Sequence, residues 1–269
     1  PSRLLSLEQF DILAKTPLEV TREFGLDKWG SLLNYFSDKQ SFTLEEVENL
    51  EQNLDQNIPC YSDDDKFFLI KARDAQKIQL KMYESVLSKY TSSASCLVEL
   101  GCGFGSKIFK LSDCKSMKSM PLYGAEYTKS GCDLTRLISK KINKKIEVGF
   151  CDFNTLEIKG IKIPKNALIF TSYSVHYVDK LNKNFIKFLV DLEPSAVVHF
   201  EPCFEYFDDD NIHDLMCKRY MQMNGYTENI ASNIELGASS IGATFKSKKN
   251  VFGANPFVPM SILEWNPST

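Results

Sequence analysis

Residues 98–106 read VELGCGFGS, an apolar stretch that runs into alternating glycines. Gly101, Gly103 and Gly105 let the chain turn tightly after a strand and let a ligand approach main-chain amides closely. Their G-x-G-x-G spacing differs from the G-x-G-x-x-G of dinucleotide-binding dehydrogenases. Glu99 stands two residues before the first glycine, where a carboxylate would repel a pyrophosphate but would suit a ligand with a cationic amino group. The stretch therefore predicts a ligand-binding turn at the end of a strand.

Short apolar runs follow this turn at intervals that leave room for helices between them. Together with the first run they cover residues 96–100, 122–126, 146–150, 167–170, 195–200, 243–252 and 258–265. The alternation of strand and helix implies right-handed crossovers and a mostly parallel sheet. The last two runs are joined by the turn-rich residues 253–256 and predict an antiparallel hairpin. We expect an α/β fold with a seven-stranded, mostly parallel sheet that ends in this hairpin.

The first ninety residues have a different character, with helical patterns and no convincing strand. Thr43 and Glu46 form a capping box, the signature of a helix start. Residues 62–65, one serine and three acids, predict the start of a second helix that reaches about Tyr90. We interpret residues 1–90 as a helical cap and residues 91–269 as the main α/β domain.

The glycine turn and the acids that follow resemble motif I and the later motifs of class I (Rossmann-like) S-adenosylmethionine-dependent methyltransferases. The resemblance covers the architecture of residues 94–266 and implies S-adenosylmethionine as the cofactor. It implies that Glu126 binds ribose hydroxyls, that Asp152 lies near the adenine amino group, and that Phe153 covers the adenine, although a core aromatic is an equal reading. The implied cofactor-binding residues are Glu99, Gly101, Gly103, Gly105, Glu126, Asp152, Phe153, Thr171 and Ser172. The fourth strand lacks N-P-P-Y or D-P-P-Y, which argues against amino-methylation of bases or glutamine.

The methyl acceptor is expected beyond the fourth and fifth strands, the region that contains all three histidines. His176 is our candidate general base or orienting group, with a loop-bonding helix residue as the alternative. Glu201, before Pro202 at the exit of the fifth strand, is a second candidate that could bind an amine or accept a proton. His199 alternates with apolar neighbours and fits a satisfied buried histidine better. Candidate substrate-binding residues are Tyr173, Tyr177, Glu205, Arg219 and Tyr226.

His213 follows the acids Asp208, Asp209 and Asp210, a combination that also occurs in metal sites. An acidic helix start explains the same pattern more simply, so we predict no metal ion. No two of the eight cysteines form a C-x-x-C pair, and free thiols in a reducing cytoplasmic setting fit best. No signal peptide or membrane-length apolar stretch is visible.

A formal net charge of −3 disfavours a nucleic-acid partner, because such binders cluster Lys and Arg. The basic residues 139–145 fit the solvated end of a helix. The sequence leaves the oligomeric state open.

The resemblance implies methyl transfer to oxygen, nitrogen or an acidic carbon of a small organic molecule, held between the carboxyl edge of the sheet and the cap. The alternatives are a protein or peptide methyltransferase and a catalytically silent cofactor-binding partner module. The glycine spacing and Glu99 disfavour a dehydrogenase.

Overall fold

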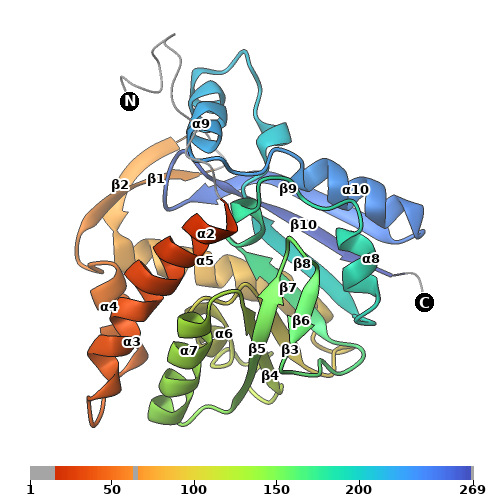
Figure 1. Ribbon diagram of the computed structural model, residues 1–269. Coiled ribbons are helices and arrows are strands. Elements are labelled where there is room, and N and C mark those ends of the chain that lie inside the picture. The colour runs from red at the N-terminus through yellow and green to blue at the C-terminus, as the bar shows by residue number, and fades with distance from the viewer. Residues whose placement is uncertain (1–15, 63–65, 268–269) are drawn as a thin grey trace.

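The computed structural model describes residues 16–62 and 66–267 of the chain. A single sheet of ten strands forms its centre, in the order β2-β1-β9-β10-β8-β7-β3-β4-β5-β6 (Figure 1). The strands are β1 (Asn57–Ser62), β2 (Lys66–Lys71), β3 (Leu97–Leu100), β4 (Leu122–Glu126), β5 (Ile146–Asp152), β6 (Glu157–Lys159), β7 (Leu168–Ser172), β8 (Ala196–Glu201), β9 (Thr244–Gly253) and β10 (Met260–Asn266). The α-helices are α2 (Pro17–Val20), α3 (Trp29–Ser37), α4 (Leu44–Glu51), α5 (Ala72–Leu87), α6 (Ser106–Leu111), α7 (Lys129–Ile142), α8 (Phe185–Val190), α9 (Ile212–Met223) and α10 (Ile230–Ser240).

All seven strands predicted from the sequence form, and their ends shift by two residues or fewer. Strands β5, β4, β3, β7 and β8 are parallel neighbours, as the strand–helix alternation predicts. Strand β10 pairs antiparallel with β8, and β9 pairs antiparallel with β10, so the terminal hairpin is confirmed.

The predicted number of strands is wrong, because three more strands extend the sheet. Strand β6 pairs antiparallel with β5 at one edge, and the β1–β2 hairpin adds to β9 at the other. Strand β6 has only three residues, too few for a periodic pattern. Strand β1 contains Pro59, which has no N–H for a sheet ladder, and β1 pairs with β9 only through Tyr61 and Ser62.

The predicted start of the second helix at residues 62–65 is also wrong, although its end near Tyr90 is confirmed. Ser62 ends β1, residues 63–65 lie outside the described part, and the helix begins at Ala72. In β2, Phe68 and Ile70 pack against the core while Phe67 and Leu69 are exposed, which is the period-two pattern of a strand. The N-terminal segment is therefore not purely helical, and its division from residues 91–269 stays a prediction.

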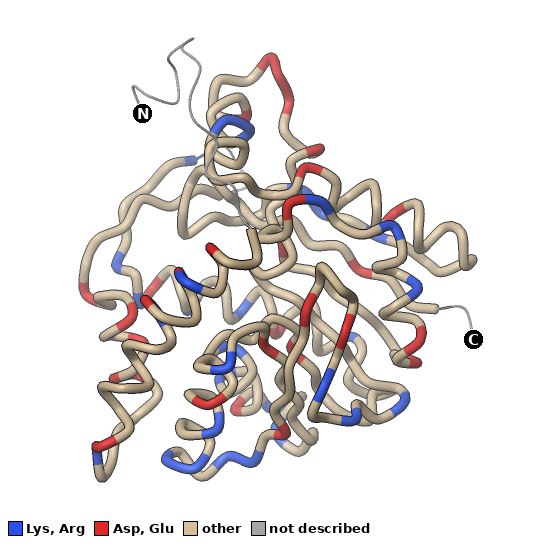
Figure 2. Tube along the Cα trace, viewed as in Figure 1, with Lys and Arg blue, Asp and Glu red and all other residues tan. Residues whose placement is uncertain are grey.

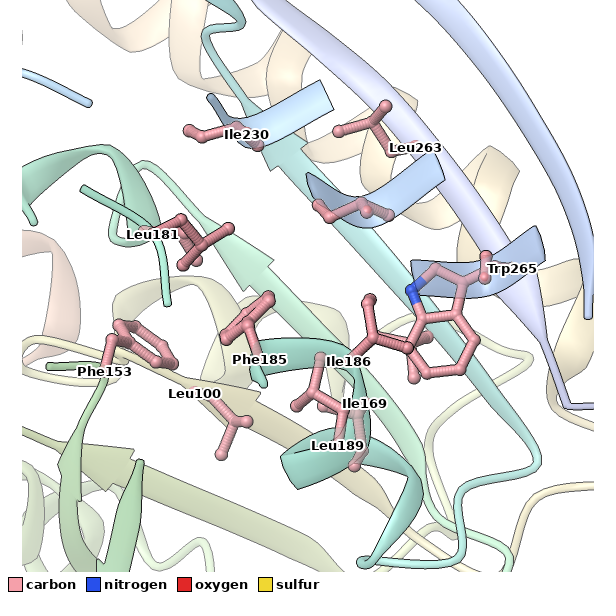
Figure 3. Close-up of a cluster of buried hydrophobic side chains, with 14 of the residues drawn as sticks. Leu100, Phe153, Ile169, Leu181, Phe185, Ile186, Leu189, Ile230, Leu263 and Trp265 are labelled. Carbon is pink, nitrogen blue, oxygen red and sulfur yellow. The ribbon is translucent and has the colours of Figure 1, made fainter. Parts of the chain in front are cut away.

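Two hydrophobic clusters cover the two faces of the sheet, because successive strand residues point to opposite sides. In β7, Ile169 joins the cluster under α8 and α10, while Leu168 and Phe170 join the cluster under α5 and α6. Figure 3 shows the first cluster, where Phe185 of α8 and Trp265 of β10 pack over the strands. Burial on both faces explains why these strands read as continuous apolar runs.

The chain between Pro17 and Ser37 is helical throughout and is called the N-terminal helical segment below. It consists of α2, a π-helical stretch (Thr21–Lys28) and α3. Leu32 and Phe36 of α3 pack against Leu134 and Ile138 of α7, which fixes the segment to the α/β core. Figure 1 shows it in red, running diagonally from α4 towards the ends of the central strands.

Several smaller predictions are also settled. The capping box of Thr43 and Glu46 forms at the start of α4. All eight cysteines are free thiols. Helix α7 ends at Ile142, so the basic residues 139–145 do mark a helix end, and Figure 2 shows blue Lys and Arg segments there among the mixed charges of the chain. None of the helices in the described residues is long and apolar enough to cross a membrane.

Candidate functional site

One pocket lies at the carboxyl ends of β3, β4, β5 and β7, where open α/β sheets bind their ligands. It encloses about 870 Å³, including the part that is open to solvent. Four groups of residues line it: the glycine turn and the start of α6, the ends of β4 and β5, the segment after β7, and the N-terminal helical segment.

The glycine turn adopts backbone angles that favour glycine at all three positions. The φ angles of Gly101, Gly103 and Gly105 are 74°, 58° and 80°. A Cβ atom on Gly101 would lie 2.3 Å from Cβ of Ser174, so the turn packs directly against the segment after β7. Both Gly101 and Gly103 line the pocket, whereas Gly105 supports the turn by packing against Phe109 of α6.

Glu126, at the end of β4, holds the glycine turn from the side. Its Oε2 accepts a 3.0 Å hydrogen bond from the main-chain N–H of Gly103. Its Oε1 accepts hydrogen bonds from the N–H and hydroxyl groups of Thr128, at 3.0 and 2.9 Å. Burial raises the pKa of this carboxyl, although these hydrogen bonds oppose the shift. Glu126 lines the pocket, so its carboxylate is positioned to receive a ligand's hydroxyl groups.

Asp152 and Phe153, at the end of β5, form the next part of the wall. The Oδ1 of Asp152 accepts hydrogen bonds from the main-chain N–H and side-chain amide of Asn154, at 2.8 and 3.1 Å. Phe153 lines the pocket and also packs edge-to-face on Phe185, at 5.8 Å between ring centroids. Phe153 therefore belongs to the hydrophobic core and also lines the pocket, and its contact with an adenine stays a prediction.

The end of β7 places two adjacent candidates differently. Thr171 is fully buried and its hydroxyl bonds Nδ1 of His199 at 3.0 Å, whereas Ser172 lines the pocket. Ser172 Oγ also lies 2.9 Å from the hydroxyl of Tyr83, a residue of α5. In the described structure Thr171 is not among the pocket-lining residues.

His176 and Glu201 come together, although they are far apart in the sequence. Nδ1 of His176 lies 3.1 Å from Oε2 of Glu201, and both side chains are buried. The main-chain N–H groups of Ser174 and Val175 also donate to Glu201, at 3.1 and 3.2 Å. Burial alone would raise the pKa of Glu201, but the hydrogen bond and charge of His176, with these amides, lower it. The carboxylate therefore fixes both the imidazole and the turn after β7.

Aromatic rings separate His176 from the pocket. Its ring lies 4.1 Å from that of Tyr177 and 4.7 Å from that of Tyr226, measured between centroids. Tyr177 lines the pocket, as does Tyr173, whose φ of 51° is strained for a bulky residue. Burial raises the pKa values of Tyr173, Tyr177 and Tyr226, so these phenols stay protonated.

His199 has the satisfied, buried environment that its sequence pattern favours. The indole N–H of Trp265 donates to its Nε2 at 3.2 Å, so Nδ1 carries the proton and donates to Thr171. Burial lowers the pKa of His199 to about 4, and the charge of Glu201 only partly opposes that shift. His199 is therefore a neutral structural residue.

The other candidates lie elsewhere. Glu205 is exposed and accepts hydrogen bonds from the main chain and hydroxyl of Ser232 in α10, while Arg219 lies in α9. His213 contacts the carbonyl of Pro256 and packs 4.3 Å from the ring of Tyr61. No group of three or more potential metal ligands occurs in the part of the chain that the structure describes.

Glu99 is completely buried beneath the glycine turn. Its Oε2 accepts a 3.2 Å hydrogen bond from the N–H of Ile108, and its Oε1 lies 3.6 Å from Nζ of Lys107. Lys107 lines the pocket, whereas Glu99 is not among the lining residues of the described structure. Burial raises the pKa of Glu99 to about 7, and the charge of Lys107 opposes this shift. Sequence reasoning missed Lys107, although its place two residues after the last glycine is a usable signal.

The N-terminal helical segment supplies a pocket wall that sequence reasoning did not assign to particular residues. Pro17, Val20, Phe24 and Trp29 line the pocket. Phe24 packs edge-to-face on Tyr177 at 4.8 Å, and Trp29 packs on Phe104 of the glycine turn at 5.1 Å. Phe24 was an available signal, because its sequence neighbours give no amphipathic reason for it, whereas Trp29 continues the apolar stripe of Leu32, Leu33 and Phe36 in α3.

Neither a protein-family model nor a curated protein matches the chain. Solved structures do match. The magnesium protoporphyrin IX methyltransferase from Synechocystis PCC 6803 with bound SAM has a TM-score of 0.54 and 11% identity, over 97% of this chain and 100% of that one. The O-methyltransferase from Bacillus cereus in complex with SAH has a TM-score of 0.52 and 17% identity, over 90% and 99%. The small RNA methyltransferase HEN1 has a TM-score of 0.52 and 14% identity, over 74% of this chain and 26% of that one.

These likenesses agree with the strand order, in which β5-β4-β3-β7-β8-β10-β9 forms the central part of the sheet. The chain has the fold of class I S-adenosylmethionine-dependent methyltransferases.

Proposed function

We propose that the chain is an S-adenosylmethionine-dependent methyltransferase that acts on oxygen, nitrogen or an acidic carbon of a small organic molecule. The observation that carries the proposal is the pocket, in which Glu126, Asp152 and the glycine turn meet at adjacent strand ends of a methyltransferase fold. Glu126 and Asp152 offer carboxylate oxygens to hydroxyl and amino groups, and Phe153 offers a ring face. Two solved structures of this fold contain SAM or SAH.

The residues fit an adenosyl cofactor because the turn leaves room for close approach and the pocket-lining residues at the ends of β4 and β5 include two carboxylates. When bound, the cofactor supplies a methyl group on a sulfonium. The chain must then align the acceptor and, where needed, remove its proton. Those tasks fall to the segment after β7, where Tyr173 and Tyr177 line the pocket and the His176–Glu201 pair lies behind the ring of Tyr177.

We propose that His176 removes the proton of the methyl acceptor. Glu201 accepts from Nδ1, so Nε2 keeps the lone pair that can take a proton. Glu201 acts through His176 and is a positioning residue. The protonated phenols of Tyr177 and Tyr226, which are hydrogen-bonded to each other, line the way between the imidazole and the pocket.

The side chains that line the pocket favour a small molecule as the methyl acceptor. Phe24 and Trp29 of the N-terminal helical segment face Tyr177 and Phe104, so aromatic groups enclose the space from opposite sides. An enclosed aromatic pocket suits an organic molecule of modest size better than a protein surface or a nucleic-acid strand.

The test has two arms. Calorimetric titration with S-adenosylmethionine, S-adenosylhomocysteine and NAD should show binding of the two adenosyl compounds only, weakened by Glu126→Ala. A panel of hydroxylated, amino and carbon-acid acceptors with methyl-labelled cofactor should then show transfer. Binding without any transfer would favour the silent partner module, transfer to peptides alone would favour the protein methyltransferase, and binding of NAD alone would refute the cofactor assignment.

A further inference from the structure

Lys107 is the only lysine or arginine among the residues that line the pocket of the described structure. It lies in the first turn of α6, directly after the glycine turn. Burial disfavours its charge, but the charges of Glu99, Tyr83 and Glu201 outweigh burial and raise its pKa, so the ammonium stays protonated. The pocket therefore contains a fixed positive charge beside a turn that is built for close ligand approach.

This ammonium is incompletely satisfied. Its ion-pair partner, Oε1 of Glu99, lies 3.6 Å away, beyond hydrogen-bonding distance, and Oε1 is itself a buried atom without a hydrogen-bond partner in the described structure. A buried carboxylate without a close hydrogen bond to its cation is costly. The Lys107 side chain is 32% exposed, so its ammonium keeps donors for a further group that would complete the arrangement. Glu99 is enclosed, so that group must bind Lys107, which lines the pocket and also a neighbouring cavity beside α4 and α5.

Lys110, one turn further along α6, is a lysine of the same helix whose ammonium has close hydrogen-bond partners. Its Nζ lies 2.6 Å from Oε1 of Glu48 and donates to Oε1 of Gln76 at 3.1 Å. Lys110 does not line the pocket. The contrast separates Lys110, which ties α6 to α4 and α5, from Lys107, whose donors are left for a ligand.

We propose that Lys107 binds the α-carboxylate at the amino-acid end of the cofactor, and that Glu99 is a positioning residue that holds Lys107 in place. The proposal rests on the cofactor assigned above. An ammonium and a carboxylate form a charge-assisted hydrogen bond, which is stronger than a bond between neutral groups. The role of Glu99 thus differs from the direct contact with a cationic amino group that its sequence position suggests.

The experiment compares S-adenosylmethionine with decarboxylated S-adenosylmethionine, which lacks only the carboxylate. The wild-type protein should bind the complete cofactor about ten- to a hundredfold more tightly by calorimetry. Lys107→Met should lose this preference by binding the complete cofactor more weakly while binding the decarboxylated compound as before. Lys107→Arg should restore part of the preference, and Lys110→Met should retain all of it.

The outcomes separate this proposal from the proposed function. Wild-type protein that binds neither compound refutes both. Wild-type protein that prefers the complete cofactor, together with a Lys107→Met variant that keeps the same preference, refutes the role of Lys107 alone. Because Lys107→Met leaves a buried carboxylate without its cation, the double variant with Glu99→Gln repeats the test in a charge-balanced background. Loss of the preference in both backgrounds supports the proposal.

Discussion

Three carboxylates at strand ends have different environments and therefore different roles. Glu126 accepts three hydrogen bonds from the glycine turn and Thr128, and Glu201 accepts bonds from His176 and two main-chain amides. Glu99 alone keeps an oxygen without a hydrogen bond in the described structure. Hydrogen bonding favours a charged carboxylate and burial opposes it, so the three groups differ in pKa although all are buried.

We expect Glu99→Gln to change how stability depends on pH. The pKa of Glu99 is raised from 4.5 to about 7, so the folded state binds a proton more tightly than the unfolded state does. The contribution of this group is therefore fully present below pH 4.5 and is lost as pH rises through 7, a loss of about 3 kcal/mol. Urea unfolding of both proteins from pH 5 to 8 should show that the free energy of unfolding of the variant increases relative to that of the wild type as pH rises. If the free energies of unfolding of the two proteins changed in parallel with pH, the raised pKa of Glu99 would be contradicted.

We expect Glu201→Gln to lower kcat about a hundredfold at neutral pH with little change in cofactor affinity, because it removes the charge that orients His176. Glu205→Gln is the matched control, because Glu205 bonds only Ser232 in the described structure. Equal losses of cofactor binding and kcat would instead indicate a purely structural role.

Among the elements, the N-terminal helical segment joins the site to the rest of the molecule. Its π-helical stretch places Phe24 in the wall of the pocket, and such stretches often occur at functional sites. The carbonyl of the next residue, Gly25, accepts a 2.6 Å hydrogen bond from the hydroxyl of Ser130 in α7. The segment is therefore held to α7 directly beside a residue that lines the pocket.

We expect Gly30→Ala and Gly25→Ala to have opposite effects. A Cβ atom on Gly30 would lie 2.6 Å from the carbonyl oxygen of Gly25, whereas a Cβ on Gly25 would make ordinary contacts of 3.5 Å with Thr128. Gly30→Ala should displace the π-helical stretch, speed amide exchange in residues 21–30 and weaken cofactor binding. Gly25→Ala should be neutral or stabilise by up to about 1 kcal/mol, because alanine favours helix. Similar exchange rates in both variants would show that the close contact has no consequence.

At the same scale, the sequence predicts some elements well and others poorly. The central strands were found because each is buried on both faces and therefore reads as a short apolar run. The β1–β2 hairpin was mistaken for a helix start because residues 62–65 look like an N-cap and its acids. The aromatic residues of β2 also fit helical spacing over so few residues. Only the pairing of β1 with β9, a contact between segments distant in the sequence, distinguishes the strand from a helix start.

For the molecule as a whole, the pocket joins segments that are far apart in the chain. Residues at strand ends, such as Glu126 and Asp152, were predictable because parallel strands bring their carboxyl ends to one edge. Trp29 was not, because its place in the pocket depends on how helices pack on that edge, whereas Lys107 follows the last glycine closely and could have been found. Glu205 shows the converse, since it follows β8 closely yet bonds a helix away from the pocket.

We expect bound S-adenosylhomocysteine to protect residues 17–29, 101–107 and 172–178 from hydrogen exchange together, because all three segments line one pocket. At a hundredfold excess over Kd the ligand should stabilise the fold by about 2.7 kcal/mol. The β1–β2 hairpin, which does not line the pocket, is the internal control and should gain no local protection. Protection confined to residues 101–107 would mean that the N-terminal helical segment packs beside the cofactor without enclosing it. Joint protection would instead tie closure of the pocket to the docking of that segment, and Gly30→Ala should then remove protection from residues 17–29 first.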